Sequence, residues 1–128
     1  MKLAVFTGQY FWFDGKNYST DEAFVSFVTS FRPYFDRIIF CDPVKKDRKT
    51  ETYILDPGYT SICPLPHFDT YSIWENLFII FPKIYQIIKA NINDWDIVWL
   101  PGPHPVGLLF AYACHTRDKP FFQLVRAN

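Results

Sequence analysis

The chain has no surplus of either charge and few cysteines. Thirteen lysine and arginine residues balance thirteen aspartate and glutamate residues among 128 residues. Without a net field to gather a polyanion, nucleic-acid binding is not expected. The three cysteines, Cys41, Cys63 and Cys114, are odd in number and form no C-x-x-C pair. This usage indicates reduced, mostly buried thiols, so we expect a cytoplasmic protein.

The sequence also lacks a secretory leader and a long apolar run. After Met1 and Lys2, the apolar run extends only over residues 3–6, which is too short for a signal peptide. The longest apolar stretch, 73–88, is interrupted by Glu75, Asn76, Pro82, Lys83 and Gln86. These residues exclude a plain membrane-spanning helix.

Several motifs that carry chemistry are missing. The first loop has neither G-x-G-x-x-G nor G-x-x-x-x-G-K-[ST], which excludes a dinucleotide fingerprint and a P-loop. No G-x-S-x-G is present, so a hydrolase is poorly supported. His67 and Asp69 form an H-x-D without a recognisable third ligand. We therefore expect no metal and no cofactor.

Aromatic side chains are abundant. They make up 20% of the chain, as do charged residues, whereas disordered chains have few aromatics and many charges. A chain of this length can build one core but not two. We expect a single domain over residues 1–128.

Apolar runs and turn signals predict an alternation of strands and helices. The predicted strands are 2–7, 38–41, 53–55, 61–65, 96–100 and 121–125. The first predicted helix begins at a Ser19–Glu22 capping box and ends before Arg32-Pro33. A second covers residues 71–92 and is kinked at Pro82. A third covers residues 106–116, with Pro105 in its first turn. Residues 9–18 and 42–51 are predicted loops.

This order predicts an α/β fold. Right-handed crossovers between successive strands give a Rossmann-like parallel sheet with helices on both faces. Such a sheet usually closes with a further helix after its last strand. We therefore expect Asn128 to be a point at which a longer chain is cut.

Candidate ligand contacts follow from the rule that ligands gather at the carboxyl ends of parallel strands. Gly15, expected just ahead of a capped helix, would let a ligand phosphate approach the helix N-terminus; the alternative is a plain turn glycine. His104 lies between two prolines after a strand and either orients an acceptor or bonds nearby backbone. Arg126 follows the last strand and either clamps an anionic group or forms a salt bridge.

The predicted helix 71–92 is apolar over more than one face. Its surplus apolar area needs a partner, which is the sheet, a second domain, another copy of the chain in a homodimer, or a lipid interface. Packing on the sheet is the default. The lipid alternative predicts peripheral contact with the inner face of a membrane.

Several short segments together resemble a known family. They are Lys2-Leu3-Ala4-Val5-Phe6-Thr7-Gly8, Asp14-Gly15, Leu65-Pro66, Asp96-Ile97-Val98-Trp99-Leu100 with Pro103-His104-Pro105, and Lys119-Pro120-Phe121-Phe122. In this order the chain resembles the amino-terminal half of GT-B glycosyltransferases, particularly the retaining glycosyltransferase family 4, or group 1. The likeness spans the whole chain.

The resemblance implies a lobe that binds a sugar or lipid-linked acceptor and faces a second lobe that holds most of a nucleotide-sugar donor. It places the loop that approaches the donor phosphates at Asp14 and Gly15. A histidine commonly follows the last strand in this family, whereas this sequence has Arg126 there. The family's donor-binding glutamates lie in the other lobe, so the resemblance assigns no catalytic residue here and implies that this chain alone is inactive.

A second hypothesis stays open. The chain is then a self-contained Rossmann-like binding or oligomerisation module without catalysis, and the wide apolar helix is its interface.

Overall fold

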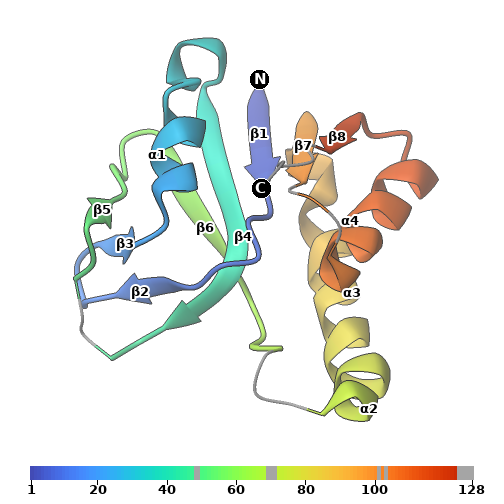
Figure 1. Ribbon diagram of the computed structural model, residues 1–128. Coiled ribbons are helices and arrows are strands. Elements are labelled where there is room, and N and C mark those ends of the chain that lie inside the picture. Colours follow the sequence, from blue (N-terminus) through green and yellow to red (C-terminus); the bar gives the residue numbers. More distant parts are fainter. Residues whose placement is uncertain (48–49, 69–71, 101, 103, 124–128) are drawn as a thin grey trace.

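A computed structural model describes residues 1–47, 50–68, 72–100, 102 and 104–123. It is an α/β fold whose central sheet is Rossmann-like (Figure 1). The parallel strands of this sheet are β1 (Lys2–Val5), β4 (Arg37–Lys45), β6 (Thr60–Leu65), β7 (Ile97–Leu100) and β8 (Phe121–Gln123). They lie in the order β6-β4-β1-β7-β8, the 3-2-1-4-5 order of a doubly wound sheet. The predicted fold class is confirmed.

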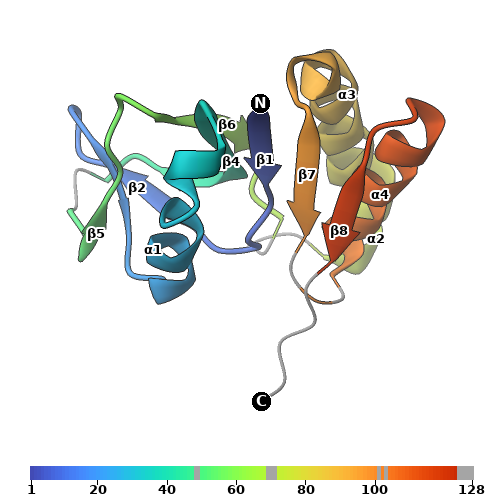
Figure 2. The same cartoon turned by 90° about the horizontal axis from the view of Figure 1, so that it is seen from above.

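Side chains that alternate along β1 build two cores. Leu3 and Val5 pack on one face of the sheet, against α1 (Ala23–Thr29). Ala4 and Phe6 pack on the other face, against α3 (Phe81–Asn91) and α4 (Pro105–Thr116). Figures 1 and 2 show α3 and α4 side by side on this second face and α1 on the opposite one. A strand buried on both faces explains the continuous apolar run at the start of the chain.

The sheet is mixed, because an antiparallel extension joins the parallel strands. β2 (Phe11–Phe13) pairs in parallel with the far end of β4, and β3 (Tyr18–Thr20) and β5 (Tyr53–Ile54) continue in antiparallel order. The prediction of a loop over residues 9–18 is therefore wrong. The predicted loop over 42–51 is also wrong for its first part, since β4 continues to Lys45 and Asp42 is fully buried.

The first helix begins later than predicted. Ser19 lies within β3, where its hydroxyl accepts a hydrogen bond from the backbone N–H of Glu51 at 2.9 Å. Glu22 is the N-cap and accepts from the N–H of Phe24 at 3.4 Å. The predicted capping box is wrong because the Ser19 hydroxyl binds the backbone of the segment before β5. A 3₁₀ turn, η1 (Arg32–Tyr34), follows the helix and contains the proline expected to stop it.

The described part of the predicted helix 71–92 is interrupted before Pro82. α2 (Ile73–Glu75) runs into a π-helical turn, η2 (Asn76–Ile80), and then into α3. The N–H of Phe81 donates to the carbonyl of Asn76, five residues back. Since proline has no N–H and crowds the carbonyl four residues before it, widening this turn accommodates the ring. Another 3₁₀ turn, η3 (Ile92–Asp94), leads to β7.

β7, α4 and the described part of the predicted strand 121–125 agree with the sequence patterns, and residues 124 and 125 lie outside the described residues. Pro105 is the first residue of α4, as predicted. Among the described residues, no helix has the length and apolar character needed to cross a membrane.

Candidate functional site

The site lies where the two halves of the sheet meet. β1 and β7 are parallel neighbours, but β1 leads to the α1 face and β7 leads directly into α4 on the opposite face. The chain therefore continues from the two strands toward opposite faces of the sheet. In doubly wound sheets this divergence forms the crevice in which ligands bind.

His104 begins α4 at this edge. Its Nδ1 accepts a hydrogen bond from the N–H of Val106 at 3.1 Å, so the imidazole is the N-cap of the helix. Phe6 and Phe68 contact the ring edge-to-face, with centroids 5.1 and 5.4 Å from its own. With Nδ1 accepting, the neutral ring carries its proton on Nε2. The cap and the two phenylalanines hold the ring in one orientation.

Gly8 turns the chain after β1 directly beside this imidazole. Its φ is +78°, a left-handed conformation that favours glycine. A Cβ at this position would lie 3.5 Å from Cδ2 and 3.7 Å from Nε2 of His104. The fold thus brings the first loop into contact with the N-terminus of α4, as expected for the carboxyl ends of neighbouring parallel strands.

Asp42 holds the Gly8 turn from the neighbouring strand. One carboxylate oxygen accepts from the N–H of Gly8 at 2.9 Å and the other from the hydroxyl of Thr7 at 2.9 Å. The N–H of Thr7 lies 3.2 Å from the carboxylate as well. Burial raises the pKa of Asp42 well above its ordinary value, and the Thr7 and Gly8 donors oppose this shift.

Replacing Gly8 with alanine should lower the free energy of unfolding by about 1–2 kcal/mol. The cause is the left-handed backbone, since a Cβ at 3.5 Å from the His104 ring is an ordinary contact. Chemical denaturation measures the change. Gly107, a glycine within α4 whose Cβ would lie 3.9 Å from the Cβ of His104, is the matched control, and Gly107→Ala should not lower the stability. Equal effects of the two variants would contradict the backbone explanation.

A hollow of about 460 Å³ opens beside His104. Its walls come from the end of β7, the first turns of α4 and the end of β8, and are mostly apolar. His104 and Gln123 supply its polar side chains. Apolar walls with a few polar groups are typical of small-molecule sites.

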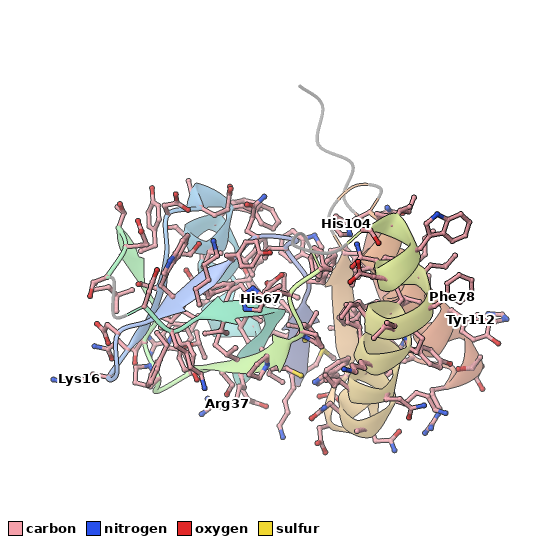
Figure 3. All side chains as sticks on the ribbon, turned by 90° about the horizontal axis from the view of Figure 1, so that it is seen from below. Lys16, Arg37, His67, Phe78, His104 and Tyr112 are labelled. Carbon is pink, nitrogen blue, oxygen red and sulfur yellow. The ribbon has the colours of Figure 1, made fainter. Side chains whose placement is uncertain are left out.

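Asp14 and Gly15 lie elsewhere. They form the turn between β2 and β3, in which Asp14 accepts from the N–H groups of Asn17 at 2.7 Å and Lys16 at 2.8 Å. These donors hold the pKa of Asp14 below its ordinary value. Gly15 has a φ of +100° and β3 separates it from α1, so the expected placement ahead of a helix is wrong. Figure 3 shows Lys16, the residue after Gly15, at one end of the molecule and His104 well away from it.

Of the other candidates, Arg126 and Asp69 lie outside the described residues. The Nε2 atom of His67 lies 3.0 Å from the carbonyl oxygen of Val44, and its ring contacts Tyr10. Within the described part of the chain, no three metal-ligating side chains gather. Sequence reasoning missed the role of Asp42, although its position directly after a buried strand is the signal that marks it.

Comparisons with known proteins support the fold. No family model and no curated protein matches the chain. A crystal structure of the C-terminal domain of a Pyrococcus furiosus hydrogenase is similar over 96% of this chain and 89% of that one, with a TM-score of 0.56 and 11% identity. A second crystal structure of that domain gives a TM-score of 0.47 and 11% identity over 95% and 88%.

At this identity, the first similarity shows the fold alone. The strand order, the helices on both faces and the divergence at β1 and β7 define an α/β domain of the Rossmann-like class.

Proposed function

We propose that this chain is the acceptor-binding lobe of a glycosyltransferase that moves a sugar from a nucleotide-sugar donor. The observation that carries the proposal is the His104 ring, fixed against the Gly8 turn at the carboxyl edge of the sheet and bordering a hollow. The resemblance to the amino-terminal half of GT-B enzymes includes Pro103-His104-Pro105 and so supports a role for His104. Hydroxyl groups of a sugar are matched by imidazole and amide groups such as those of His104 and Gln123.

The proposal divides the work between two lobes. The acceptor would occupy the hollow beside His104, and most of the donor would bind to a partner lobe. Asp14 and Gly15 lie far from this hollow, so the first loop would contribute through Gly8 instead. Arg126 follows β8 in sequence and stays a candidate for an anionic group. We expect no sugar transfer by this chain alone.

A titration followed by NMR tests the site. Methyl glucoside, methyl mannoside and methyl galactoside are added separately to the ¹⁵N-labelled chain. We expect at least one of them to shift the amide signals of Gly8, Val106 and Gly107 in a saturable manner. His104→Ala should weaken binding about tenfold, the effect of roughly 1.4 kcal/mol.

His115→Ala is the matched control, because His115 is an exposed histidine at the other end of α4. It should leave the titration unchanged. Shifts that are equal in the wild type and in His104→Ala, or that lie away from the carboxyl edge, would contradict the proposed site.

An exposed apolar patch supports a second part of the proposal, contact with the inner face of a membrane from the cytoplasm. The patch consists of Ile73, Trp74, Leu77, Phe78 and Ile79 from α2 and η2 and of Leu108 and Tyr112 from α4, each at least 50% exposed. Trp74 and Phe78 stack with their planes 10° apart. In Figure 3, Phe78 and Tyr112 point away from the sheet on the same side of the molecule.

Apolar patches of this kind mark interaction surfaces, and tryptophan is favoured at membrane interfaces. A membrane at this patch would present a lipid-linked acceptor close to the carboxyl edge. A module that forms a homodimer through the patch is the alternative function.

A further inference from the structure

Cys41 and Cys63 face each other on adjacent strands. They are register partners in the parallel pair β4–β6. Neighbouring strands lie about 4.7–4.9 Å apart, which falls within the range of about 4.4–6.8 Å between the Cα atoms of a disulfide. Both side chains contact the core beneath α3 and α4, so they project from the same face of the sheet. All three cysteines are free thiols in this structure.

The two thiols have different surroundings. Cys41 is fully buried, whereas Cys63 is partly exposed and borders a hollow of about 520 Å³. Polar side chains of the hollow include Lys2, Arg37 and Asn91. An oxidant dissolved in water can therefore reach Cys63 first.

The pKa values of the two thiols are shifted in opposite directions. The neighbouring Cys41 side chain lowers the pKa of Cys63, while burial raises the pKa of Cys41, whose sulfur lies 4.0 Å from the carbonyl oxygen of Ile39. Because the thiolate is the nucleophile, Cys63 is the reactive partner and Cys41 stays protonated.

The position of β6 allows the sulfur atoms to approach. Among the described strands, β6 pairs with β4 alone and is therefore an edge strand. Pro64, the residue after Cys63, has no N–H to donate to a ladder. A small displacement of this edge is thus less restricted than one in the middle of the sheet.

We propose that Cys63 is an oxidation site for hydroperoxides and that Cys41 converts the product into an intramolecular disulfide. The Cys63 thiolate attacks one peroxide oxygen, the O–O bond breaks, and hydroxide leaves as Cys63 becomes a sulfenic acid. The Cys41 sulfur then attacks the sulfenyl sulfur, the S–O bond breaks, and hydroxide leaves with the Cys41 proton as water. The hydroxide of the first step takes a solvent proton, so that two thiols and hydrogen peroxide give one disulfide and two waters.

Thiol counting after mild oxidation tests this site. The native chain is treated with hydrogen peroxide, quenched with catalase, unfolded and titrated with a thiol reagent. We expect the number of free thiols in the wild type to fall from three to one and its mass to fall by two hydrogen atoms. On a denaturing gel without reductant, the oxidised chain should run as a monomer. Dithiothreitol should restore all three.

Two serine variants separate the cysteines. Cys114→Ser, the matched control, should lose both of its thiols, whereas Cys63→Ser should keep both. Cys41→Ala should stop at the sulfenic acid, which dimedone captures. If Cys41→Ala fails to fold, Cys63→Ser decides the question, because Cys63 is partly exposed. The proposal is overturned if the wild type keeps three thiols at a dose that oxidises free cysteine, if it forms dimers through disulfides, or if Cys63→Ser loses thiols equally.

Discussion

Replacing Asp42 with alanine is expected to lower the free energy of unfolding by about 2–5 kcal/mol. The variant removes the acceptor for the N–H of Gly8, for the N–H of Thr7 and for the Thr7 hydroxyl. Thr7 is buried, and each buried donor left without a partner costs about 1–3 kcal/mol. The loss should also release the Gly8 turn beside His104. Chemical denaturation followed by tryptophan fluorescence measures the change in stability.

Asp42→Asn is the matched control and carries a pH test. Its amide oxygen can still accept from Gly8, and its NH₂ can donate to the Thr7 hydroxyl oxygen, so a smaller loss is expected. Burial raises the folded-state pKa of Asp42, so the folded chain holds a proton that the unfolded chain releases. Wild-type stability should therefore fall as pH rises from about 3.9, the ordinary value, through the raised folded value.

Asp42→Asn has no carboxyl to titrate, so its stability should be flatter over this range. A pH profile of Asp42→Asn that is parallel to that of the wild type would contradict the raised pKa. An Asp42→Ala variant as stable as the wild type would contradict the role of Asp42 in holding the Gly8 turn.

Local patterns were sufficient to predict the central sheet. β1 and β7 are short apolar runs that end in a turn residue or a proline, and α4 begins at the proline expected in its first turn. Alternation of such runs with helices leaves few topologies once crossovers are right-handed. The order β6-β4-β1-β7-β8 is one of these topologies and was not itself predicted.

Contacts between distant residues explain what local patterns missed. Phe11 becomes part of a strand because β2 pairs with Val44, more than thirty residues away. Ser19 is diverted from helix capping by Glu51. Asp42 stands at the head of a charged segment, yet the Gly8 turn buries it. In each case the contacting residue is far away in the sequence, so a local pattern cannot predict the contact.

The candidate site, like the fold, was predictable where local patterns define it and not where distant contacts do. His104 was accessible to sequence reasoning because a loop between prolines after a strand must lie at the carboxyl edge. Gly15 was misplaced because its interpretation depended on a helix following directly, whereas β3 intervenes. Gly8 meets His104 only because β1 and β7 are neighbours, which is a property of the sheet.

Exchanging both Trp74 and Phe78 for serine should abolish the proposed membrane contact. The two side chains are 67% and 68% exposed, so their removal leaves the core intact and stability nearly unchanged. Burying the exposed part of each ring in lipid contributes roughly 2–3 kcal/mol, at about 25 cal/mol per Å². The double variant, which loses both rings, should therefore bind vesicles about a thousandfold more weakly or worse. Co-sedimentation with vesicles of phosphatidylglycerol and phosphatidylcholine measures the affinity.

Tyr34→Ser is the control for a general effect of exposed aromatics, because Tyr34 is 74% exposed on η1, outside the patch. It should bind vesicles like the wild type. Sedimentation without lipid tests the alternative, in which a second copy of the chain covers the patch. If the wild type is a dimer, the double variant is a monomer and neither binds vesicles, the patch is an interface between copies. In that case the oligomerisation module replaces the membrane contact, while the His104 titration still decides whether the carboxyl edge binds a sugar.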